Sequence, residues 1–197
     1  MTMALAFRHL PPELQAAKET LAAARRDALP TNEARKSRVA LYLLLFAIGT
    51  LAAAPLVQLG IVSATDKIFW RTGLTAISVL SGFMVTTMVF TGKIEAAKSL
   101  SLSELRDVAS KVNYLLLYQI GTLANHLVCL SMMLLAPSIA TKWPTVGSPI
   151  AVLCLGLFFV SIARSALIPV QIIELHRFTH AALLRDKRDE AVSKADL

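Results

Sequence analysis

The residue in this sequence with the most demanding chemistry is Arg164, because it interrupts a long apolar segment. Residues 143–163 and 165–173 on either side of it contain no Asp, Glu, Lys or Arg. A guanidinium stays charged at any accessible pH, and placing one near the centre of a membrane-spanning helix costs at least about 2.5–3.5 kcal/mol. The Arg164 side chain therefore needs partners that offset this cost.

A polar stripe in another uncharged segment, residues 112–141, provides candidate partners for Arg164. On a helix, Gln119, Thr122 and His126 lie within about 80° of one another, with Asn125 to one side. His126 is either a buried histidine bonded to a neighbour or part of a proton relay or ligand site. If the two helices adjoin, this stripe meets the helical face of Arg164. We therefore predict an intramembrane polar cluster of Arg164, Gln119, Thr122, His126, Asn125, Ser161 and Gln171.

No carboxylate in the apolar segments can neutralise Arg164. All thirteen acidic residues lie outside the predicted spans. The nearest along the same helix is Glu174, ~15 Å away. Three solutions stay open: snorkelling or neutral oxygens, a water-filled cavity or oligomer axis, and an acid or lipid phosphate from another molecule.

A second stripe of small and hydroxyl residues lies in residues 72–92. Thr75, Ser78, Gly82 and Thr86 fall within about 80° on one face of a helix. Such residues let a neighbouring backbone approach closely and hydrogen-bond across helices. We predict a helix-packing face, and a water-lined path is the alternative.

These residues must be positioned by helices that cross a membrane. The chain has 197 residues, of which 55% are hydrophobic and 17% charged. Soluble domains carry roughly 45–50% apolar and about 25% charged residues, so one aqueous core cannot hide this apolar surface. A span needs about 20 apolar residues, and the alternation typical of membrane strands is not visible. We predict an all-α integral membrane four-helix (tetraspan) bundle with spans at 39–60, 73–91, 112–136 and 149–173.

The distribution of Lys and Arg predicts the orientation of the bundle. Sixteen of the twenty flank the spans on the side of both termini, and three flank the other side. By the positive-inside rule we expect both termini to lie on the cytoplasmic side of the membrane. We expect this membrane to be a bacterial inner membrane. The net charge of +7 then indicates attraction to anionic inner-leaflet lipid, not to nucleic acid. An aromatic belt accounts for the outer Trp70 and Trp143 and the inner Tyr42, Tyr114 and Tyr118.

Helical extensions are predicted on the cytoplasmic side. Residues 1–38 form an amphipathic segment with a helix at 12–28, and residues 174–197 form a helical tail around 174–190. Between the second and third spans, residues 93–111 contain a capping box that starts the third helix near residue 102. On the outer side, Ser148 and Pro149 are expected to start the fourth helix as its cap and first residue.

The sequence lacks the patterns of an enzyme or a cofactor protein. No P-loop, nucleophile elbow, metalloprotease motif or pair of intramembrane acids is present. His176 and His180 are four residues apart but have no third ligand at a fixed spacing. Cys129 and Cys154 are expected to be inert core thiols. We predict no catalytic residues, no metal and no cofactor.

The expected function is that of a non-enzymatic inner-membrane subunit. It is expected to form a homo-oligomer and to scaffold or regulate a soluble or membrane partner through its cytoplasmic helices. The alternative is a homo-oligomeric pore or channel favouring anions, of the type found in phage-defence or toxin systems. In that alternative, Arg164, Gln119 and His126 line the water path.

Overall fold

The part of the chain that the structure describes consists of four long helices and contains no strand. A computed structural model describes residues 19, 22, 32–92 and 102–195. The helices are α2 (Asn32–Gln58), α3 (Lys67–Gly92), α4 (Leu102–Lys142) and α5 (Pro144–Ala195). Each contains a segment long and apolar enough to cross a membrane, namely Lys36–Gln58, Lys67–Thr91, Leu105–Lys142 and Pro144–Arg177. The predicted fold class is confirmed, and the protein is a multi-pass membrane protein.

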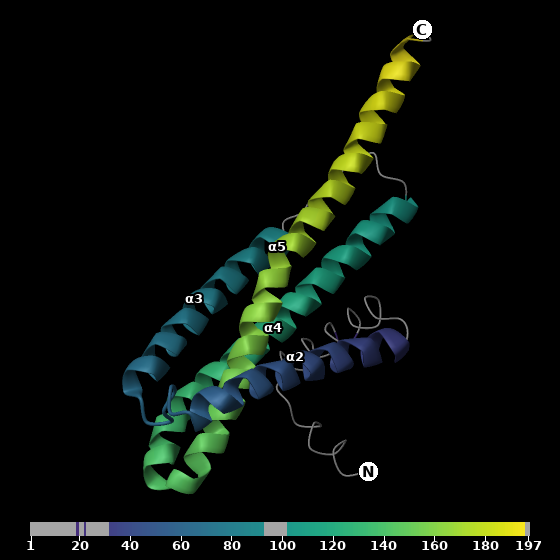
Figure 1. Ribbon diagram of the computed structural model, residues 1–197. Coiled ribbons are helices and arrows are strands. Elements are labelled where there is room, and N and C mark those ends of the chain that lie inside the picture. The colour runs from purple at the N-terminus through teal and green to yellow at the C-terminus, as the bar shows by residue number, and fades with distance from the viewer. Residues whose placement is uncertain (1–18, 20–21, 23–31, 93–101, 196–197) are drawn as a thin grey trace.

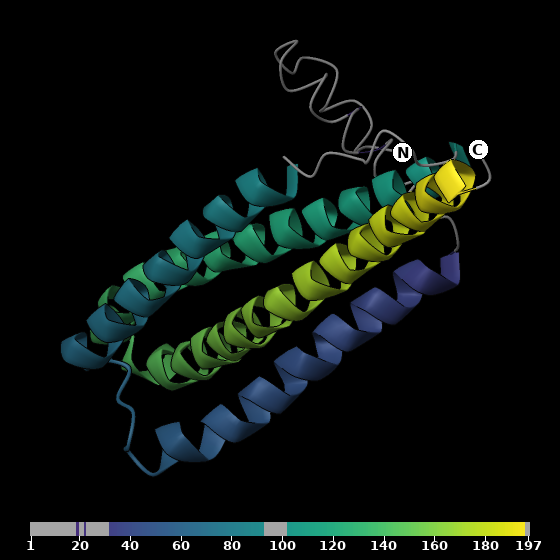
Figure 2. The ribbon, with the colours of Figure 1, turned by 90° about the horizontal axis from the view of Figure 1, so that it is seen from above.

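The four helices lie side by side in the order α3, α4, α5, α2 (Figure 2). α4 and α5 form the centre, α3 packs mainly on α4, and α2 packs on α5. We call the end where α2 begins and α5 finishes the tail end, and the end where α2 joins α3 and α4 joins α5 the loop end. From the loop end, α2 diverges from α5 toward the tail end (Figure 1). Chain order and spatial order therefore differ, because α2 and α3 lie at opposite edges.

The connection between α2 and α3 closes the loop end. Gly60 adopts a positive φ of 71°, which favours glycine, just after α2 ends. Asp66 caps α3, since its Oδ1 accepts hydrogen bonds from the backbone N–H groups of Ile68 at 3.0 Å and Phe69 at 3.1 Å. Trp70 then turns inward and donates from Nε1 to the Ser63 carbonyl at 3.1 Å. With only 1% exposed, Trp70 is a core residue and not part of an outer aromatic belt.

The connection between α4 and α5 is a single residue, Trp143. The Trp143 carbonyl accepts a hydrogen bond from Val146 N–H at 3.1 Å, so Pro144 takes the first helical position. The prediction that Ser148 and Pro149 start this helix is therefore wrong, because Pro144 already satisfies the same rule five residues earlier. The predicted start of the third helix agrees with the observed start of α4 at Leu102.

Helix α5 continues well beyond its membrane-spanning segment at the tail end. α5 runs from Arg177, where its spanning segment ends, to Ala195, a further length of about 27 Å. It includes the predicted tail helix at 174–190. The predicted helix at 12–28 lies outside the described residues except for Glu19 and Ala22, and so does the part of 93–111 before Leu102.

A hydrophobic core lies between α3, α4 and α5 toward the loop end. Its buried members are Trp70, Ile77, Cys129, Met133, Ala136, Ala151 and Cys154. Both cysteines are free and buried, as expected for thiols that serve as small apolar side chains. This core holds three helices together, and α2 reaches it with Val57 near its loop end.

Two glycines allow α2 to approach α5 closely. A Cβ on Gly49 would lie 2.8 Å from the Phe159 Cβ and 3.1 Å from the Gly156 carbonyl oxygen. A Cβ on Gly156 would overlap the Thr50 methyl group and lie 3.1 Å from the Phe46 ring. The crossing therefore depends on the absence of side chains at both positions, as in other close helix contacts in membranes.

We predict that Gly156→Ala weakens the attachment of α2 by about 1–3 kcal/mol, the usual cost of overpacking a tight contact. Gly82→Ala is the matched control, because a Cβ there meets nothing within 4 Å. Reversible unfolding in mixed detergent, followed by circular dichroism, measures both. Equal stability of the two variants would contradict the proposed close crossing.

Candidate functional site

Arg164 lies at the junction of α2, α4 and α5, where its guanidinium reaches neutral oxygens. Its Nε donates to the Thr122 hydroxyl at 3.0 Å, and its Nη2 donates to the Tyr118 carbonyl at 3.4 Å. Tyr118 returns a hydrogen bond from its own hydroxyl to the Arg164 carbonyl at 3.3 Å. The side chain is therefore held to α4 by contacts in both directions.

Aromatic rings complete the surroundings of Arg164. The guanidinium carbon lies 4.6 Å from the centre of the Tyr118 ring and 5.9 Å from that of Tyr42. Both distances are within the range of cation–π attraction, which is strongest where water is excluded. Gly121 makes room, since a Cβ there would lie 3.3 Å from Nη2. Tyr42 and Tyr118 thus surround a cation and do not face the lipid interface as a belt would.

No carboxylate within the described residues forms an ion pair with Arg164. The observed partners are a hydroxyl, a backbone carbonyl and two rings. They use two of the five N–H donors of the guanidinium. Of the three ways of offsetting the charge of Arg164 that the sequence left open, the geometry favours hydrogen bonds to neutral oxygens. The aromatic faces add to them.

Asn125 connects α4 to both α2 and α5. Its Oδ1 accepts a hydrogen bond from the Tyr42 hydroxyl at 2.7 Å. Its Nδ2 donates to the Ser161 hydroxyl at 2.7 Å. Ser161 is fully buried and donates in turn to the Leu157 carbonyl at 2.9 Å. One amide therefore bonds α2 and α5 to α4 at mid-membrane depth.

His126 connects α4 to α3 and α5. Its Nε2 lies 3.0 Å from the Ser165 hydroxyl, and its Nδ1 lies 3.3 Å from the Ser81 hydroxyl. Ser165 donates its proton to the Ser161 carbonyl, and Ser81 donates its proton to the Ile77 carbonyl at 2.8 Å. A neutral imidazole has one N–H group, so it donates to only one of these two hydroxyls. The fully buried ring therefore lies between two serine hydroxyls, the arrangement of a buried histidine bonded to a neighbour.

Gln119 faces α3 and does not contact Arg164. Its Nε2 donates to the Thr91 hydroxyl at 3.1 Å, and Thr91 donates to the Thr87 carbonyl at 2.8 Å. Its Oε1 is buried and has no hydrogen-bond partner. The polar stripe on α4 therefore divides between two neighbours, because α4 is sandwiched between α3 and α5.

Of the residues predicted on the stripe, Thr122 alone donates or accepts a hydrogen bond with the Arg164 side chain. Gln119 and His126 form their hydrogen bonds with other residues, Gln119 with Thr91 and His126 with serines of α3 and α5. On α4 those two residues point about 40–60° further round the helix than Thr122. Both are fully buried within one molecule, so a pore between copies of the chain would not be lined by them.

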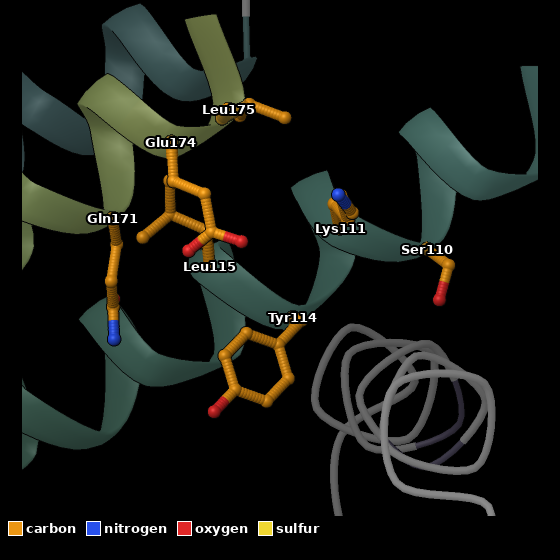
Figure 3. A pocket seen from close by; sticks show the side chains of 7 residues that line it. All are labelled: Ser110, Lys111, Tyr114, Leu115, Gln171, Glu174 and Leu175. Carbon is orange, nitrogen blue, oxygen red and sulfur yellow. The ribbon is translucent and has the colours of Figure 1, made fainter. Parts of the chain in front are cut away.

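Gln171 also lies apart from the cluster, about 10 Å along α5 from Arg164 toward the tail end. It lines a cavity of about 210 Å³ between α4 and α5 (Figure 3). The other lining residues are Ser110, Lys111, Tyr114, Leu115, Glu174 and Leu175. The amide oxygen of Gln171 is buried and has no hydrogen-bond partner.

The stripe on α3 points away from the bundle. Thr75, Ser78, Gly82 and Thr86 are all exposed. Their hydroxyls donate to carbonyls one turn earlier in α3, at 3.1, 2.8 and 3.0 Å. No helix in the described part of the chain covers this face. The stripe is therefore not a packing face between helices of one molecule, and α3 packs through its opposite side, with Ile77 and Met84 fully buried there.

Sequence reasoning missed the roles of the tyrosines and of Arg38. Tyr118 is one turn before Thr122 and on the same face, a signal that could have placed it beside Arg164. Tyr42 and Arg38 carried no such signal, because only the packing of α2 brings them to α4. Arg38 lies over the Tyr114 ring at 4.1 Å.

We predict that the Tyr42 and Asn125 side chains stabilise the protein as a pair. In a double-mutant cycle of Tyr42→Phe and Asn125→Ala, the coupling energy is expected to be about 0.5–1.5 kcal/mol, since one buried hydrogen bond is lost. Unfolding in mixed detergent measures it. Ser131→Ala is the control, because that exposed hydroxyl bonds only to the Leu127 carbonyl of its own helix. A coupling energy of zero would contradict the contact.

The arrangement can hold a charge and a set of hydrogen bonds in the membrane, and it joins all four helices. Its polar groups come from α2, α3, α4 and α5. Comparison of the chain with protein-family models, with curated proteins and with solved structures finds no match.

Proposed function

We propose that this protein is a non-enzymatic subunit of the bacterial inner membrane. It self-associates through the outer face of α3 and presents its tail-end helices to a partner in the cytoplasm. The excess of Lys and Arg at the tail end supports this orientation. No part of this proposal requires a cofactor or metal.

The observation that carries self-association is the uncovered stripe of α3. α3 lies at the edge of the helix array (Figure 2), and a Cβ added to Gly82 on its outer face would meet nothing within 4 Å. Small residues in such a position let a second helix approach closely, and hydroxyls can hydrogen-bond across the contact. A second copy of the chain fits this face better than lipid, because acyl chains gain nothing from the hydroxyls.

The length of α5 supports contact with a partner at the tail end. Beyond Arg177 the helix continues in a direction away from the membrane-spanning segments (Figure 1). Leu184 on this extension is 71% exposed. An unpacked helix of this length is marginal in water, so a partner that covers it would stabilise it.

We expect copies of the protein to be joined through α3. With Ser78→Cys, oxidation in native membranes is expected to give a covalent dimer, resolved by non-reducing electrophoresis. Ser131→Cys is the matched control, because Ser131 is likewise exposed and bonded only to its own helix, but lies on α4. The native thiols are buried and do not interfere. Equal dimer yields from both variants would contradict an α3 interface.

We expect Gly82→Leu to reduce this self-association, because the added side chain would keep the backbone of a second helix from approaching α3 closely. Energy transfer between labelled copies in liposomes measures the loss. Ala52→Leu, an equal enlargement at an exposed position of α2, is expected to have no effect. Undiminished association of Gly82→Leu would argue against the proposal.

A photo-crosslinking residue at Leu184 is expected to capture a soluble protein in cells. The same residue at Ile68, which is 80% exposed at the loop end, is expected to capture none of it. Mass spectrometry identifies the adducts. Identical adducts at both positions would show that contact is not confined to the tail end, contrary to the proposal.

A further inference from the structure

Arg38, like Arg164, lies inside a membrane-spanning segment and against a tyrosine ring. It belongs to the segment Lys36–Gln58, and its guanidinium carbon lies 4.1 Å from the centre of the Tyr114 ring. Its Nη2 is buried and has no hydrogen-bond partner. No ion pair joins Arg38 to any residue that the structure describes. A buried charged donor without an acceptor is costly, and no described residue accepts a hydrogen bond from it, so an anion from another molecule would stabilise it.

The two arginines lie in one aromatic layer. Tyr114 is under Arg38 and Tyr118 is under Arg164, and these tyrosines are one turn apart on α4, about 6 Å along the helix. Two positive charges therefore lie close together between α2 and α4, with neither paired to a carboxylate of the described chain. This local charge favours an anion.

Tyr114 also forms a wall of the cavity between α4 and α5. Figure 3 shows Gln171 and Glu174 extending from α5 toward α4, with Tyr114 and Lys111 across from them. The cavity volume of about 210 Å³ accommodates several water-sized groups. Its buried Gln171 oxygen has no donor. One tyrosine thus borders both a donor that lacks an acceptor and an acceptor that lacks a donor.

We infer that this place binds the head group of an anionic phospholipid from the membrane leaflet at the tail end. The phosphate diester accepts hydrogen bonds from Arg38, and a hydroxyl of a glycerol head group donates to Gln171. Basic sites between spanning helices at a membrane surface are suited to such lipids. The inference does not depend on self-association through α3.

Titration of the full-length protein in neutral detergent tests the inference, with native mass spectrometry as the readout of retained lipid. Phosphatidylglycerol is expected to be retained in preference to phosphatidylcholine, which has no head-group donor. Arg38→Gln is expected to raise the Kd for phosphatidylglycerol about tenfold, the effect of losing one charge-assisted hydrogen bond. Gln171→Leu, which leaves both arginines in place, is expected to raise the same Kd by a smaller factor.

Arg106→Gln is the control for general surface charge, because Arg106 is exposed at the tail end of α4 and does not line the cavity. Its Kd is expected to match that of the unaltered protein. Added inorganic phosphate is expected not to displace the lipid. The inference is overturned by equal retention of phosphatidylcholine, by equal effects of Arg106→Gln and Arg38→Gln, by an unchanged Kd in both Arg38→Gln and Gln171→Leu, or by displacement with free phosphate.

Discussion

The structure depends on accommodating the charge of Arg164 within the membrane without a carboxylate. The guanidinium forms two hydrogen bonds to neutral oxygens of α4. It also lies against the faces of Tyr118 and Tyr42, and these contacts together offset the cost of the charge. Each contact is weaker than a buried ion pair, but none leaves a second charge to be desolvated. The guanidinium therefore requires α2, α4 and α5 to meet at one depth.

The same requirement explains how the four helices are held together. An apolar face gives little specificity in lipid, because acyl chains are as apolar as leucine. In this protein Asn125 bonds α2 and α5, His126 bonds α3 and α5, and Gln119 bonds α3. α4 thus forms a hydrogen bond with each of its three neighbours. At the α2–α5 crossing, small residues let the two backbones approach closely.

Unsatisfied polar atoms mark the places where the chain is incomplete by itself. Arg38 and Gln171 lack partners at the tail end, and the hydroxyl stripe of α3 is satisfied within its own helix but covered by nothing in the described chain. The first pair is suited to a ligand with both an anionic acceptor and a donor. The stripe is suited to a neighbouring helix. Both features lie on the periphery, and in the central network the buried Gln119 oxygen also has no hydrogen-bond partner.

The sequence by itself determined the class of protein, the number of spans and the residues that cannot face lipid. The length of each apolar segment, the uncompensated charge of Arg164 and the start of α4 can all be read from local composition. The sequence did not determine which helices adjoin. Gln119 and His126 share a stripe with Thr122, yet Gln119 bonds α3 and His126 bonds both α3 and α5. The stripe on α3 faces outward. Only the tertiary structure decided these points, because helical periodicity fixes the direction of a side chain relative to its own axis and not which helix lies there.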